Sequence, residues 1–144
     1  LNMNEVFNHN IEVCYYQNIK NGKDITLENG KVIPNKQLTF DPPKTKSYAY
    51  CSDTKYNEQI VPLVKNADVL YHESTFLESE EDLAEKTMHS TAKQAANIAK
   101  LANVGQLILG HYSTRYSNID DFKEEAQTIF PNILLADDGK TFQF

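Results

Sequence analysis

Short apolar runs bounded by polar residues recur through the last two thirds of the chain. Four of these runs are YAYC at 48–51, ADVLYHE at 67–73, QLILGHY at 106–112 and ILLA at 133–136. A fifth run, KTFQF at 140–144, lies at the end of the sequence. Each has the length and the β-branched or aromatic content typical of a strand, so five strands are predicted here.

Helical periodicity marks the segments between these runs. The clearest helix is predicted over 90–104, where small residues recur on one face: Ala92, Ala95, Ala96, Ala99 and Ala102. Further helices are predicted over 56–66, 79–86 and 119–130. Because strands and helices alternate, we expect an α/β fold with one mostly parallel sheet and helices packed on it.

Residues 1–47 follow a less regular pattern. The turn pairs Asn21-Gly22 and Asn29-Gly30 separate short β-type runs, which predict small strands or an extended arm. The DPPK segment at 41–44 predicts a stiff joint, because adjacent prolines exclude helix and central strand. We therefore expect two parts, an arm or hairpin segment over 1–47 and an α/β part over 48–144.

Composition narrows the functional classes. Apolar residues make up 40% of the 144 residues, and the net charge is −6. No apolar run approaches the ~18 residues of a membrane span, and two cysteines make no disulfide framework, so we expect a cytoplasmic protein without a membrane partner. A negative net charge disfavours non-specific nucleic-acid binding, and a phosphate substrate would therefore require a cation in the site.

Ionisable residues follow the predicted strands, where a parallel sheet builds its ligand site. Asp53 follows the first strand, His72 and Glu73 end the second, and His111 ends the third. Asp137 and Asp138 follow the fourth strand. These residues also have structural explanations. Asp53 could be the N-cap of a helix, and Asp137 and Asp138 could form a turn with Gly139.

The histidines and the arginine also admit two interpretations. His72 lies among apolar residues and is expected to point away into a structural hydrogen bond. His89 lies directly before the alanine-rich helix and fits either a surface residue or a proton donor, which Glu73 could orient. Arg115 fits either a surface ion pair or a bidentate contact to an anion near His111. Together, aspartate and histidine ligands suit zinc or another borderline divalent ion, which could assist attack on a phosphate ester.

Five segments carry a resemblance to a known family. CSDT, YHESTF, MHSTAKQAANIAK, LGHYSTRY and LLADDG resemble, in this order, the second half of ribonuclease Z. Members of that family are endonucleases with the metallo-β-lactamase fold, and they process the 3′ end of precursor tRNA. NIKNGKDITLENGKVI at 18–33 is similar to the segment after the family's tRNA-gripping arm.

The resemblance implies roles for individual residues. Asp53 and His111 match metal ligands, and the complete enzyme would hold two zinc ions. His89 matches the proton donor to the leaving 3′ oxygen, and Glu73 matches the glutamate that holds it. Arg115, together with Ser113 in the same segment, would contact the phosphate or the RNA.

The family's main metal motif, His-x-His-x-Asp-His, does not occur in this sequence. We therefore expect weak or no zinc binding, and no nuclease activity, from this chain by itself. The resemblance implies only the C-terminal half of an αββα sandwich, which leaves one sheet face exposed, so we expect a homodimer or larger assembly. Two alternatives stay open: a metallo-β-lactamase-fold phosphodiesterase or arylsulfatase-like hydrolase, and a noncatalytic assembly or RNA-binding module.

Overall fold

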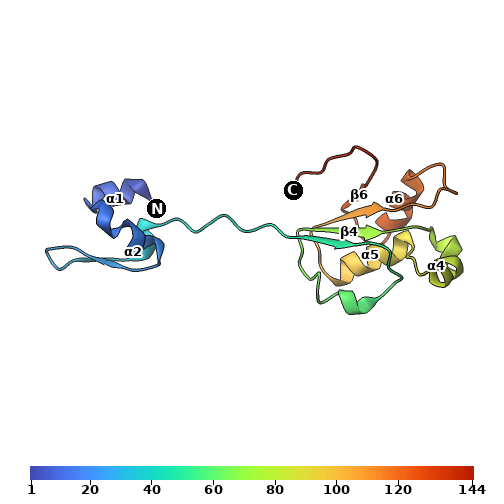
Figure 1. Cartoon of the computed structure of the whole chain (residues 1–144), viewed down its shortest axis with the longest axis horizontal. Helices are drawn as coiled ribbons and strands as arrows, with labels where there is room; N and C mark the ends of the chain where they lie inside the picture. The colour runs from blue at the N-terminus through green and yellow to red at the C-terminus, as the bar shows by residue number, and fades with distance from the viewer. The chain divides into compact units, whose positions relative to one another are not determined.

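A computed structural model describes all 144 residues of the chain. The chain divides into two compact units, Leu1–Lys44 and Thr45–Phe144. The division falls directly after the proline-containing segment 41–44, close to the boundary at residue 47 that the sequence predicts. Figure 1 labels some of the elements of each unit.

The first unit is built from short elements around a small aliphatic core. They are α1 (Met3–Asn8), a 3₁₀ turn (Val13–Tyr15), α2 (Tyr16–Lys20), β1 (Ile25–Thr26), β2 (Val32–Ile33) and α3 (Asn35–Leu38). The strands β1 and β2 pair antiparallel, and Gly30 in their turn has a φ of +79°, which agrees with the predicted Asn29-Gly30 turn. The core contains six buried residues: Val6, Ile11, Ile19, Ile25, Ile33 and Leu38.

The prediction of only strands or an extended arm over 1–47 is wrong for the three helices of this unit. They span six, five and four residues. A period of about 3.6 residues cannot be read from one or two turns, so their hydrophobic pattern resembles that of irregular chain.

The second unit is an α/β layer with a single parallel sheet. Its strands are β3 (Tyr48–Cys51), β4 (Val69–Glu73), β5 (Gln106–Gly110) and β6 (Ile133–Leu135), in the spatial order β3-β4-β5-β6. All three strand pairs are parallel. The helices are α4 (Glu81–Thr87), α5 (Ala92–Leu101) and α6 (Asp120–Gln127). The predicted α/β fold with one parallel sheet is confirmed.

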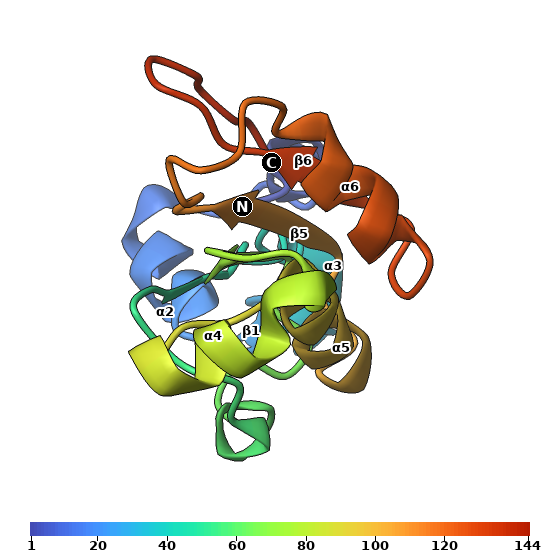
Figure 2. The ribbon, with the colours of Figure 1, turned by 90° about the vertical axis from the view of Figure 1, so that its right-hand side faces the viewer.

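The helix α5 packs its alanine face on the sheet. Ala92, Ala95, Ala96 and Ala99 are completely buried, as the periodicity predicts. A capping box starts the helix, in which the side chains of Thr91 and Gln94 each accept a bond from the other residue's amide. The helix contacts β4 and β5, α6 contacts β6, and the two helices contact each other (Figures 1 and 2).

The two faces of the sheet differ in composition. Leu70, Leu107 and Leu109 belong to the buried cluster under the helices and have no exposed surface. On the other face, the rings of Tyr50 and Tyr71 stack with centroids 4.6 Å apart, and Tyr50 is 63% exposed. This second face is the one that the sequence predicts to lie open.

Two predicted elements do not form. The segment 56–66 contains only a 3₁₀ turn at Glu58–Ile60, because Pro62 has no amide hydrogen to continue a helix. The segment 140–144 has no strand. Instead the Phe144 ring stacks on Tyr48, which lies on β3, at the opposite edge of the sheet from β6. No helix of the chain is sufficiently long and apolar to span a lipid bilayer.

Candidate metal and acid–base site

The carboxyl ends of neighbouring strands bring the candidate residues together. Because β3, β4 and β5 run parallel with Cys51 beside His72 and His72 beside Leu109, the residues that follow them share one edge of the sheet. Asp53 follows β3, Glu73 is the last residue of β4, and His111 follows β5. His89 lies between α4 and α5 and reaches the same edge.

Glu73 is the buried centre of this group, and its carboxylate has no exposed surface. Its Oε1 accepts a bond from the Thr54 amide at 3.1 Å and lies 2.8 Å from Nδ1 of His89. Its Oε2 accepts from the Thr75 amide at 3.0 Å and from the Thr75 hydroxyl at 2.7 Å. A carboxylate offers about four acceptor positions. These four donors fill them, which offsets the cost of burying the charge.

His89 is held by a tight turn and by this carboxylate. Met88 ends α4 in the left-handed conformation with φ 65°, and the His89 amide then donates to the carbonyl of Ala84 at 2.8 Å. Because the Nδ1 of His89 faces the Glu73 carboxylate, that nitrogen carries a hydrogen and donates it. Nε2 is left as the atom that can exchange a proton with a ligand.

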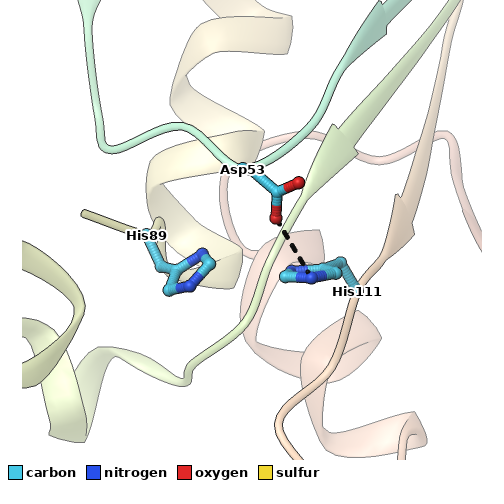
Figure 3. A group of neighbouring side chains, drawn as sticks. All are labelled: Asp53, His89 and His111. Atoms are coloured by element: carbon cyan, nitrogen blue, oxygen red, sulfur yellow. Dashed lines mark ion pairs between the residues drawn. The ribbon is translucent and has the colours of Figure 1, made fainter. Parts of the chain in front are cut away.

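Asp53 and His111 face one another at the exposed side of the site. Asp53 Oδ1 lies 3.2 Å from His111 Nε2, and the two side chains are 70% and 43% exposed. Figure 3 shows this pair with the His89 ring beside it. Both residues adopt left-handed backbone, with φ 49° for Asp53 and 63° for His111. Such conformations are uncommon outside glycine and cluster at functional sites.

Gly110 allows β5 to deliver His111 at this point. A Cβ atom at Gly110 would lie 2.5 Å from the hydroxyl oxygen of Tyr71, so no larger residue fits while the tyrosine ring stays in place. Burial, followed by the neighbouring Tyr50, raises the pKa of Tyr71 to about 12. The phenol beside His111 is therefore neutral at physiological pH.

The donor set fits a divalent metal ion. Asp53, His89 and His111 can each offer one ligand atom, and these atoms lie within 4.8 Å of one another. Zinc prefers such imidazole nitrogens and carboxylate oxygens. Both histidines turn Nδ1 toward hydrogen-bond partners, Glu73 for His89 and the Thr75 hydroxyl, at 2.9 Å, for His111. Second-shell bonds of this kind orient metal-ligating histidines.

Arg115 and Ser113 lie on the loop after His111. The Arg115 Nε donates to Ser113 Oγ at 3.2 Å, and its guanidinium lies 5.2 Å from the centre of the Phe76 ring. One Nη atom is 3.7 Å from a Glu80 carboxylate oxygen in an exposed pair. The Ser113 amide donates to the Thr75 carbonyl at 3.0 Å, which connects this loop to the turn that holds Glu73.

The remaining strand-end residues separate into two groups. His72 is completely buried, and its Nδ1 lies 2.7 Å from the Glu73 carbonyl oxygen, which agrees with the predicted structural hydrogen bond. Asp137 and Asp138 line a hollow of about 400 Å³ together with His111. They thus lie at the predicted edge, beside the metal-ligand group rather than within it.

The sequence does not single out Thr75 or Thr54, although both bind the central carboxylate. Thr54 uses only its backbone amide, which no side-chain pattern can reveal. Thr75 binds through both its amide and its hydroxyl, and no pattern in the sequence distinguishes that hydroxyl from those of other threonines.

A parallel sheet with helices on one face and an Asp/His ligand set at its strand ends defines the architecture of a metallo-β-lactamase-type hydrolase domain, of which this chain holds a part. The chain belongs to the beta-lactamase superfamily, because the model of the Beta-lactamase superfamily domain matches residues 31–112.

Its curated relatives include proteins named ribonuclease Z. The chain is 45% identical over 131 residues to that of Parabacteroides distasonis and 49% identical over 125 residues to that of Cytophaga hutchinsonii. These matches cover 91% and 86% of this chain. The chain is therefore a ribonuclease Z homologue, but it spans only 43% and 40% of the length of these two relatives.

Solved structures give the same fold. The metallo-beta-lactamase fold protein YhfI from Bacillus subtilis matches with a TM-score of 0.64 and 27% identity, covering 69% of this chain and 40% of that one. A long form RNase Z from yeast matches with a TM-score of 0.55 and 26% identity, covering 62% of this chain and 12% of that one.

Proposed function

We propose that this chain is the C-terminal part of a zinc-dependent endoribonuclease that cleaves precursor tRNA at its 3′ end. The observation that carries the proposal is the contact of 2.8 Å between Glu73 and His89 beside the Asp53–His111 pair. An acid–base residue next to a metal-ligand pair suits metal-assisted phosphodiester hydrolysis. The relatives that match about nine tenths of the chain are named ribonuclease Z.

The side chains divide the reaction between them. Of the three possible ligands, we assign Asp53 and His111 to zinc. We keep His89 for proton transfer, because its Nδ1 is bonded to the buried Glu73 carboxylate. Zinc, when bound, supplies Lewis acidity and an activated water for attack on phosphorus. His89, with Nδ1 bonded to Glu73, delivers the proton from Nε2 to the 3′ oxygen as its bond to phosphorus breaks. Glu73 orients the ring and stabilises the charge that it carries before the transfer.

Arg115 supplies positive charge near this edge of an acidic chain. Its exposed pair with Glu80 is weak, because solvent-exposed ion pairs contribute little. The guanidinium can therefore exchange Glu80 for a phosphate oxygen, with Ser113 keeping its position.

Cleavage of precursor tRNA by a protein that joins this chain to a His-x-His-x-Asp-His segment tests the proposal. His89→Ala should lower the turnover about 10²–10⁴-fold while the zinc content stays unchanged. His9→Ala, in the first unit, is the matched control and should leave turnover unchanged. Unaltered turnover in His89→Ala would show that the acid role is wrong.

The substrate class needs a separate comparison. A small phosphodiester cleaved as efficiently as precursor tRNA would favour a phosphodiesterase or related hydrolase of the same fold. No cleavage of either substrate with added zinc would favour a noncatalytic module.

We also propose that the tyrosine-rich face of the sheet associates with a second copy of the chain. Tyr48, Tyr50 and Phe144 are 51%, 63% and 45% exposed on this face. Exposed aromatic patches of this kind mark interaction surfaces. Light scattering should show a dimer or larger species at micromolar concentration, and Tyr50→Glu should shift it to the monomer. A monomeric wild-type chain would contradict this proposal.

A further inference from the structure

Thr75 lies between the buried carboxylate and the histidine assigned to the metal. Its Oγ1 is 2.7 Å from Glu73 Oε2 and 2.9 Å from His111 Nδ1, and the residue is 7% exposed. A hydroxyl group has one hydrogen to donate and two lone pairs that accept. It can therefore donate to only one of these two neighbours.

The carboxylate takes that hydrogen. If the hydroxyl pointed to His111 instead, two oxygens with no hydrogen between them would face each other at 2.7 Å in a buried site. The shorter contact is also the one to a charged acceptor, which forms the stronger hydrogen bond. With the hydrogen on the Glu73 side, the lone pairs of the Thr75 oxygen face His111.

We infer that Thr75 is a positioning residue that fixes the tautomer of His111. An accepting hydroxyl requires a hydrogen on Nδ1 of His111, which leaves a lone pair on Nε2 of the neutral ring. That nitrogen faces Asp53 Oδ1 at 3.2 Å, so two electron-rich atoms meet where a cation fits between them. The inference rests on the proposed function in one respect, namely that His111 is assigned to the metal ion.

One buried carboxylate then fixes which ring nitrogen carries the hydrogen in both histidines of the site. Glu73 reaches His89 directly and His111 through the Thr75 hydroxyl. Without that hydroxyl, neutral His111 can carry its hydrogen on Nε2 and donate it to Asp53. The hydrogen would then occupy the atom that a metal ion needs, so the Thr75 hydroxyl keeps the Nε2 lone pair of His111 available.

Nitrogen-15 NMR tests this directly, with histidine-labelled full chain that is metal-free and at a pH well above ~6.5, the ordinary pKa of histidine, so that a free histidine is neutral. His111→Ala assigns the resonances. In the wild-type chain, Nδ1 of His111 should be protonated and Nε2 unprotonated. Thr75→Val should shift the Nε2 resonance into the protonated range, and Thr75→Ser should restore the wild-type pattern. Thr128→Val removes a hydroxyl that bonds only the Glu125 carbonyl, so it should change nothing.

Two results would overturn the inference. One is a wild-type His111 that carries its hydrogen on Nε2, a result that needs no variant to fold. The other is a folded Thr75→Val chain whose His111 keeps the wild-type tautomer. No RNA enters the measurement, so a failure to cleave precursor tRNA would refute the proposed function and leave the tautomer result standing.

Discussion

The interior between the sheet and the helices differs from the loops at the carboxyl edge of the sheet in burial and in backbone conformation. The same strands contribute to both regions. In the interior, Leu107, Leu109 and Phe122 are completely buried in regular strands and helices. At the edge, Asp53 and His111 keep 70% and 43% of their side chains exposed, and both have left-handed backbone.

This difference means that the residues that stabilise the α/β unit are not those that form its ligand site. Buried apolar side chains contribute most of the favourable free energy of folding. Strained backbone and exposed charges contribute none, and they persist where a ligand site needs them. Substitutions in the interior should therefore destabilise the chain, whereas substitutions at the edge should change binding more than stability.

The largest expected effect is in the interior. Phe122 packs its ring against Tyr112 and Tyr116, with centroids 4.7 and 4.9 Å apart. Phe122→Ala should lower the free energy of unfolding by about 3–5 kcal/mol in urea titrations, because it leaves a cavity. Leu63→Ala, at a position that is 84% exposed, is the control and should change the free energy of unfolding by about 0.5 kcal/mol or less. Equal losses for both variants would contradict the contrast.

His72 is a titratable side chain buried in the interior. Burial lowers the pKa of His72, and its bond to the Glu73 carbonyl only partly opposes this. The unfolded chain takes up a proton below pH ~6.5 that the folded chain resists. Stability should therefore fall as the pH drops below ~6.5, by at most about 1.4 kcal/mol per pH unit, until the lowered pKa is reached.

His72→Leu should flatten this acid dependence in urea titrations at about pH 7 and pH 5. A variant that loses stability with acid as steeply as the wild-type chain would show that other groups cause it.

A smaller effect, an increase in stability, is expected at the turn directly before His89. Met88 has φ 65° and is 56% exposed, so a side chain there adds strain and little packing. Met88→Gly should stabilise the chain by about 1 kcal/mol, raising the melting temperature by about 4 °C. Met88→Ala keeps the strain and should give no gain. If both variants behave alike in calorimetry, backbone strain is not stored at this turn.

The smallest effect on stability is expected for Asp53→Asn. Asparagine tolerates left-handed backbone, and the Asp53 side chain is mostly exposed. The free energy of unfolding should change by about 0.5 kcal/mol or less. In a protein that also carries the His-x-His-x-Asp-His segment, zinc affinity measured by calorimetric titration should fall because a charged ligand is lost. A large loss of stability would mean that Asp53 has a structural role.

The sequence predicts the parallel sheet and the longer helices because their patterns extend over enough residues. The alanine face of α5 and the apolar run of β5 are examples. The one-turn helices of the first unit and the irregular segment around Pro62 lack such a pattern. KTFQF has the composition of a strand, but its Phe144 stacks on Tyr48 instead, and no local pattern reports that tertiary contact.

For the site, the sequence predicts the strand-end positions that converge but not the bonds between them. Asp53, Glu73 and His111 follow from the topology of a parallel sheet. The contacts of Thr75 depend on how one hydroxyl lies between two side chains, a detail that only three-dimensional coordinates show.

Zinc content after dialysis tests most directly whether this edge is one part of a larger metal site. Asp53 and His111 supply two ligands, while catalytic zinc ions usually take about three protein ligands each. We predict that the dialysed chain retains well below about one zinc ion per molecule, and that a protein also carrying a His-x-His-x-Asp-His segment retains about two. Retention of about two zinc ions by this chain alone would contradict the account.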